Sequence, residues 1–146
     1  MNPVMQLLEF ATSAGSRLDA FLLDTALQWD ETAEPDEPRG ELGDCYYNAW
    51  TLAEARNWEY AEGYATTTEL GVPLMHAWCI DAEGRVVDPT WADGENYTGV
   101  VIPVDIVRRV MVDTEVYGVL PNLWMCRGDA GAVLFAIAVA AGAVEE

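Results

Sequence analysis

The chain has 146 residues, of which 51% are hydrophobic, and carries 25 acidic residues against seven arginines and no lysine, for a formal net charge of −18. This length and apolar content predict one globular domain over residues 1–146 with a sizeable core. The negative charge argues against nucleic acids and anionic membrane surfaces as partners, because both would be repelled.

The termini and the cysteines indicate the compartment. Residues 1–10 lack the basic start and long apolar core of a signal peptide, and the three cysteines are an odd number, so a reduced, cytoplasmic chain is expected. The most apolar segment, 130–144, is shorter than the roughly 20 residues that span a bilayer. Its alanine-rich composition predicts a closing helix.

The N-terminal third predicts helices followed by a loop. Apolar residues at helical spacing run from residue 4 to residue 29, with a break at 13–16, which predicts two helices. The acidic, proline-containing stretch 30–43 predicts a solvated loop, and the sequence leaves open whether residues 30–42 act as a lid. A third helix is expected from Cys45, with Asp44 as its N-cap.

Short strands are expected after this helix. Alternating patterns predict strands at 58–65, 73–80 and 85–91, a strand running into a short helix over 100–111, and further strands at 115–120 and 123–126. Helices, then a mainly antiparallel sheet, then a closing helix indicate an α+β fold.

The hairpin after His76, the only histidine, links that residue to an acid. A lone histidine beside apolar residues is usually structural, but the turn at 81–85 suggests more. Gly84 is the third residue of a three-residue loop, where a left-handed conformation is needed. In that register Asp88 lies opposite Trp78 and diagonal to His76, within reach of an Asp–His hydrogen bond.

The same register selects one of the three cysteines. Cys79 points to the face opposite His76, and Cys126 precedes a Gly-Asp turn with no helix start at its thiol. Cys45 begins a helix, where the dipole and free N–H groups favour a thiolate. We therefore expect a triad in which Cys45 is the nucleophile, His76 transfers the proton and Asp88 fixes the imidazole tautomer.

The neighbouring residues each have alternative roles. The Cys45 N–H is a natural oxyanion donor and Asn48 a candidate second donor, although an asparagine on a helix is more often solvated. Trp78 and Trp91 either wall an acyl-binding groove or belong to the core. Tyr64 either lines the same groove or closes the sheet.

Three stretches resemble the core of the transglutaminase-like cysteine enzymes: GDCYYNAW at 43–50, YAEGYA at 60–65 and HAWCIDAEGRVVDPTW at 76–91. The resemblance covers about residues 40–91. It implies a papain-like α+β fold with the nucleophile Cys45 at a helix start, and His76 and Asp88 on adjacent strands of an antiparallel sheet. The chain has no Asp-x-Asp-x-Asp-Gly calcium loop. Arylamine acetyltransferases, whose approach to the cysteine is similar to RGELGDC, share the triad but are longer.

These observations predict a cysteine-dependent hydrolase or acyltransferase that acts on an amide or related acyl bond through a thioester, without a cofactor. The substrate would be a peptide or a small amide. A zinc site from the three cysteines and His76 lacks any C-x-x-C pair, so no metal is predicted. The alternative is a catalytically idle module of the same fold that binds or inhibits a protein partner. The oligomeric state stays open.

Overall fold

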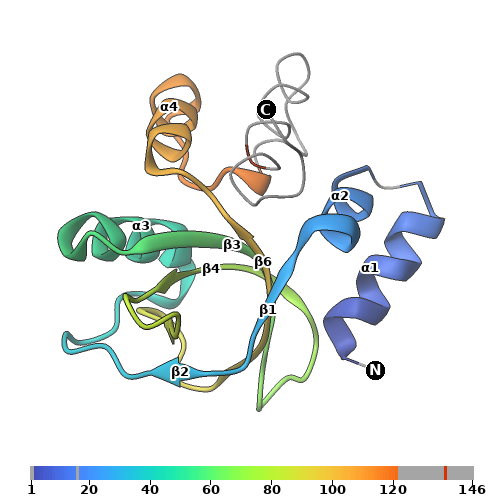
Figure 1. Ribbon diagram of the computed structural model, residues 1–146, viewed down its shortest axis with the longest axis horizontal. Coiled ribbons are helices and arrows are strands. Elements are labelled where there is room, and N and C mark those ends of the chain that lie inside the picture. Colours follow the sequence, from blue (N-terminus) through green and yellow to red (C-terminus); the bar gives the residue numbers. More distant parts are fainter. Residues whose placement is uncertain (1, 16, 122–136, 138–146) are drawn as a thin grey trace.

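The computed structural model describes residues 2–15, 17–121 and 137 (Figure 1). Its helices and strands follow in this order: α1 Pro3–Ser13, α2 Arg17–Thr25, β1 Leu27–Trp29, β2 Thr32–Ala33, the 3₁₀ turn η1 Leu42–Asp44, α3 Cys45–Arg56, β3 Glu59–Thr67, β4 Leu74–Ile80, β5 Val86–Val87, β6 Gly94–Val101 and α4 Val104–Thr114. In this part of the chain no helix combines the length and the apolar character that a membrane span requires.

The strands form one six-stranded sheet in the order β1-β6-β3-β4-β5-β2. Every neighbouring pair is antiparallel except β2 and β5, which are parallel, so the sheet is mixed rather than purely antiparallel. The two edge strands, β1 and β2, are consecutive in the chain and separated only by residues 30–31. The sheet therefore curls almost into a barrel (Figure 1). The α+β class predicted from the sequence is confirmed.

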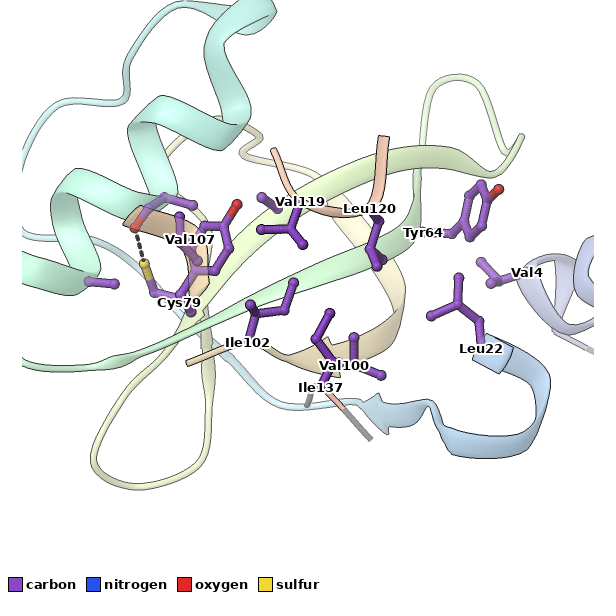
Figure 2. Close-up of a cluster of buried hydrophobic side chains, with 14 of the residues drawn as sticks. Val4, Leu22, Tyr64, Cys79, Val100, Ile102, Val107, Val119, Leu120 and Ile137 are labelled. Atoms are coloured by element: carbon purple, nitrogen blue, oxygen red, sulfur yellow. Dashed lines mark hydrogen bonds between the residues drawn. The ribbon is translucent and has the colours of Figure 1, made fainter. Parts of the chain in front are cut away.

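Each face of the sheet has its own core because successive side chains along a strand point to opposite sides. Helices pack on one face, over a cluster that includes Tyr60, Cys79 and Val100 (Figure 2). The smaller cluster on the other face is aromatic, with Trp78 and Tyr97 at its centre. His76 and Trp78 alternate with Ala77 and Cys79 along β4, so His76 belongs to the aromatic face.

Two expectations for the N-terminal third are wrong. Residues 27–29 continue the apolar spacing of a helix, yet they form β1, because Leu27, Gln28 and Trp29 pair with β6. The acidic stretch 30–43 is not all loop either, since Thr32 and Ala33 pair with β5. Long-range pairing thus overrides local patterning in both segments.

The expectation of a strand at 115–120 is also wrong. The chain leaves α4 through Glu115 in a left-handed conformation (φ 60°), bends, and turns helical at Leu120. The backbone N–H groups of Val119 and Leu120 are bound by a carboxylate of β3, so they do not pair with a strand. The strand expected at 123–126 lies outside the described residues. So does the closing helix at 130–144, apart from Ile137, which is buried.

Candidate active site

The β4–β5 hairpin has the register that the sequence predicts. The Asp81 N–H donates to the Arg85 carbonyl at 2.9 Å, and the Gly84 N–H donates to the Asp81 carbonyl at 3.0 Å. Gly84 adopts a positive φ of 80°, as the third position of such a loop requires. Cys79 consequently pairs with Val87. The next residue, Asp88, then lies on the same face as His76.

His76 and Asp88 are both buried and directly hydrogen-bonded. The His76 Nε2 to Asp88 Oδ2 distance is 2.8 Å. The Tyr97 hydroxyl donates to the same oxygen at 2.7 Å, while the N–H groups of Thr90 and Trp91 donate to Oδ1 at 2.9 Å each. Burial alone would raise the pKa of Asp88, but these bonds, above all the one from His76, hold that pKa below its ordinary value. Asp88 is therefore an ionised acceptor.

The ionised acid fixes the histidine tautomer. Nε2 must donate to Asp88, so in the neutral imidazole the lone pair is on Nδ1. Nδ1 is buried, and within the described part of the chain it has no hydrogen-bond partner. Trp91 stacks on the imidazole, with ring centroids 3.6 Å apart and planes 6° apart. The ring is thus held in place with one basic nitrogen unused.

Cys45 is the first residue of α3, as the sequence predicts. Asp44 occupies the N-cap position, as the sequence predicts, although its side chain makes no capping hydrogen bond. The helix packs against β4 through Ala49 and Ala53, and the Cys79 thiol donates to the Ala49 carbonyl at 3.1 Å (Figure 2). Cys79 therefore lies on the helix side of the sheet, away from His76, as the register predicts.

The Cys45 thiol lies against the backbone of Ala77, the residue that follows His76. β3 pairs with β4 along its whole length, whereas β5 pairs only with Cys79 and Ile80. The second edge of β4 is thus free of strand pairing at Ala77, and a hydrogen bond from this backbone acts on the Cys45 sulfur. The residue whose backbone acts on the thiol is therefore the neighbour of His76 in β4.

The Cys45 thiol is not predisposed to ionise by itself. Burial raises its pKa to about 11, and the negative charges of Glu62 and Asp88 act in the same direction. Hydrogen bonds from the backbone of Ala77 and Tyr46 oppose this rise. The expected lowering of the thiol pKa by the helix start is therefore wrong, because desolvation outweighs it. At neutral pH the thiol keeps its proton unless a base takes it.

Asn48 does not serve as the expected oxyanion donor. Its Nδ2 donates to the Glu41 carbonyl and to the Thr90 hydroxyl, each at 3.0 Å, which uses both amide protons. Two further hydrogen bonds join residues 39–40 to residues 88–89. Asn48 thus fastens α3 to the segment that carries Asp88, and the acidic loop is held against the site at this end.

The aromatic groove candidates belong to packed clusters. Tyr64 lies on the helix side of the sheet, where its hydroxyl donates to Asp19 Oδ1 at 3.1 Å. Trp78 is fully buried on the other side. Trp91 is half-buried and packs on His76. Of the three, only Trp91 is in direct ring contact with the candidate triad. The ring of Trp78 lies further from the His76 imidazole, with centroids 6.2 Å apart.

Sequence reasoning missed two residues of the site. Tyr97, from β6, completes the donors on Asp88, and nothing near Asp88 in the sequence points to it. Glu62, from β3, is fully buried and accepts hydrogen bonds from the Tyr60 hydroxyl and from the N–H groups of Val119 and Leu120. Burial raises the pKa of Glu62. An acid within the apolar strand EYAEGYA is the signal that could have revealed it.

Comparison of the chain with models of protein families, with curated proteins and with solved structures finds no match. Among the described residues, no three histidine, cysteine, aspartate or glutamate side chains gather as metal ligands would. The site thus combines a thiol beside the backbone of Ala77 with an acid-bound imidazole on the preceding residue.

Proposed function

We propose that the chain is a cysteine-dependent enzyme that acts on an amide or related acyl bond through Cys45, His76 and Asp88. One observation carries this proposal. His76 Nε2 is hydrogen-bonded to Asp88, and His76 Nδ1 is buried without a hydrogen-bond partner in the described part of the chain. The next residue, Ala77, is the one whose backbone acts on the Cys45 thiol. An unpaired buried nitrogen costs free energy, and a free Nδ1 is what a general base needs.

The proposed reaction has two halves. His76 Nδ1 takes the proton of the Cys45 thiol, and the sulfur attacks the carbonyl carbon. The backbone N–H groups at the start of α3 stabilise the oxyanion. The carbon–nitrogen bond then breaks, and Nδ1 returns its proton to the leaving amine. Water in a hydrolase, or another nucleophile in an acyltransferase, then attacks the resulting thioester while Nδ1 takes its proton. The carbon–sulfur bond breaks, and Nδ1 returns this proton to the Cys45 sulfur.

The arrangement of elements is compatible with a papain-like, transglutaminase-like fold, which is part of this proposal. A helix begins at the cysteine and packs on a sheet, and the histidine and aspartate follow from adjacent strands of one hairpin. Water is always present as an acceptor, so hydrolysis is the preferred of the two outcomes. A peptide or small amide is the expected substrate.

One observation favours a second candidate function, a catalytically idle module that binds or inhibits a protein. Burial raises the pKa of Cys45 to about 11, so the thiol stays protonated if His76 does not take its proton. At pH 7 only about one thiol in ten thousand would then be ionised. A free cysteine, with a pKa of about 8.5, is ionised to about 3%.

The rate of alkylation separates the two functions. Iodoacetamide labelling of each cysteine is followed by mass spectrometry between pH 5 and pH 10, with N-acetylcysteine as the free-thiol reference. A working pair labels Cys45 at pH 7 at least as fast as the reference, through a thiolate formed by transfer to His76. An idle site labels Cys45 more slowly than the reference, by up to about 300-fold if the ionised fractions alone set the two rates. That result would overturn the enzymatic proposal.

A variant and an intermediate complete the test. His76→Gln keeps the ring position filled but cannot accept the thiol proton, and it is expected to slow Cys45 labelling about 100-fold or more while leaving that of Cys79 unchanged. Incubation with an activated ester is expected to add one acyl group to Cys45, detected as a mass increase that hydroxylamine removes. The wild-type comparison with N-acetylcysteine decides the question even where the variant fails to fold.

A further inference from the structure

Tyr97 and His76 share one oxygen of the Asp88 carboxylate. The Tyr97 hydroxyl donates to Asp88 Oδ2 at 2.7 Å, and His76 Nε2 donates to the same atom at 2.8 Å. All three side chains are buried, so bulk water does not compete for this oxygen. Two donors on one acceptor atom weaken each other, because each draws on the same negative charge.

Tyr97 is held where it can only donate. Its ring lies edge-to-face against Trp78, with a centroid distance of 5.0 Å. Burial and the negative charge of Asp88 raise the pKa of Tyr97; Asp93 adds to this rise and Arg39 opposes it. The hydroxyl therefore keeps the proton that it gives to the hydrogen bond with Asp88.

Gly94 makes room for this hydroxyl. A methyl group added at Gly94 would lie 1.9 Å from the Tyr97 hydroxyl oxygen and 3.3 Å from Asp88 Oδ2. Gly94 is not among the glycines with a positive φ, so its backbone conformation does not require glycine. The close approach of Tyr97 to Asp88 does require it. Two residues of β6, Gly94 and Tyr97, thus serve the same contact.

We propose that Tyr97 is a positioning residue that restrains the basicity of His76 by sharing Asp88 Oδ2. A carboxylate whose charge is partly taken up by Tyr97 stabilises an imidazolium less, so Nδ1 holds an added proton less tightly. In the proposed reaction Nδ1 must take the thiol proton and then give it to the leaving amine, and too strong a base would keep it. The consequence for Cys45 rests on the proposed function, whereas the effect on His76 does not.

The single histidine of the chain makes the test direct, because only one imidazole contributes signals. The Nε2–H proton of His76 is observed by NMR in protein labelled with ¹⁵N-histidine. Tyr97→Phe is expected to move this signal to lower field, because loss of the competing donor strengthens the bond from Nε2 to Oδ2. Gly94→Ala is expected to move it in the same direction, since the added methyl group displaces the Tyr97 hydroxyl.

Tyr64→Phe is the matched control. The Tyr64 hydroxyl also donates to a buried aspartate, Asp19, at 3.1 Å, but on the helix side of the sheet. This variant loses the same kind of hydrogen bond and is expected to leave the His76 signal unchanged. A signal that stays in place or moves to higher field in Tyr97→Phe, or that moves equally in Tyr64→Phe, would overturn the proposal. Tyr97→Phe keeps the ring packing and decides alone if Gly94→Ala fails to fold.

Labelling of Cys45 separates this proposal from the proposed function. If His76 takes the thiol proton, a more basic imidazole raises the ionised fraction of Cys45. Tyr97→Phe is then expected to speed iodoacetamide labelling of Cys45 at pH 7 about two- to five-fold, and to leave that of Cys79 unchanged. Slower labelling of Cys45 would contradict the restraint by Tyr97. A moved His76 signal with unchanged Cys45 labelling would instead refute proton transfer between His76 and Cys45, and with it the proposed function alone.

Discussion

Replacing Asp88 by Asn tests the tautomer argument directly. The carboxylate of Asp88 accepts four hydrogen bonds, two on each oxygen. The asparagine oxygen can keep the two backbone bonds from Thr90 and Trp91, but its amide then faces His76 Nε2 and the Tyr97 hydroxyl. His76 is expected to move its proton to Nδ1, so that Nε2 accepts from the amide. Nδ1 would then be unable to take the Cys45 proton.

The effect has two measurable magnitudes. Four hydrogen bonds to a charged acceptor, worth about 1.5–3 kcal/mol each, become neutral ones worth about 0.5–1.5 kcal/mol, so the variant is expected to lose roughly 4–6 kcal/mol of unfolding free energy. General acid–base catalysis contributes about 10²–10⁴-fold, and turnover is expected to fall by that factor. Labelling of Cys45 at pH 7 is expected to fall towards that of an isolated thiol with a pKa of about 11.

Urea denaturation measures the first effect, and site-resolved iodoacetamide labelling measures the second. Asp81→Asn is the matched control, because Asp81 lies in the same hairpin and accepts three hydrogen bonds without contacting His76. The control is expected to perturb the turn but leave Cys45 labelling unchanged. If Asp88→Asn labels Cys45 at the wild-type rate, the reasoning from tautomer to nucleophile is refuted.

Three further predictions concern stability. Glu62→Ala leaves three buried donors without an acceptor, and it is expected to lower the free energy of unfolding, measured by urea denaturation, by about 3–5 kcal/mol. Glu62→Gln keeps an acceptor and is expected to lose less; equal losses would contradict this. Gly84→Ala is expected to cost about 1–2 kcal/mol from its positive φ alone, since nothing lies within 4 Å of the added methyl group, and an unchanged melting temperature would argue against the turn assignment. The lowered pKa of Asp88 contributes stability that is present above the unfolded-state pKa of about 3.9 and lost as the pH falls through the folded-state pKa. Tyr97→Phe removes a donor to Asp88 and is therefore expected to move acid unfolding, followed by tryptophan fluorescence, to higher pH; a shift to lower pH would contradict the assignment.

The part of the site that could be predicted is the part determined by local rules. A glycine at the third loop position selects the turn, the turn selects the register, and the register places His76 and Asp88 on one face. Each step depends on neighbours within about a dozen residues. The start of α3 at Cys45 was predictable for the same reason.

The rest depends on contacts between distant segments. Tyr97 reaches Asp88 only because β6 lies in the same sheet, and Glu62 binds the N–H of Val119 across 57 residues of sequence. The pKa of Cys45 follows from burial, which a helix start does not reveal. Residues 115–120 have the composition of a strand, but their backbone bonds go to a side chain that the local pattern does not contain.

The adjacency of β1 and β2 in the chain has a consequence for aggregation. Exposed strand edges are templates onto which other chains can pair, and long, flat edges are the most hazardous. The strand order places the longer strands, β3, β4 and β6, between two edge strands of three and two residues, which Asp30 and Glu31 join. The second edge of β4 is paired only at Cys79 and Ile80. Segment 27–33 thus supplies both edge strands of the sheet, with two negatively charged residues between them. If this segment detached, the edges of β5 and β6 would be exposed together. Its pairing therefore protects both edges of the sheet from pairing with another chain.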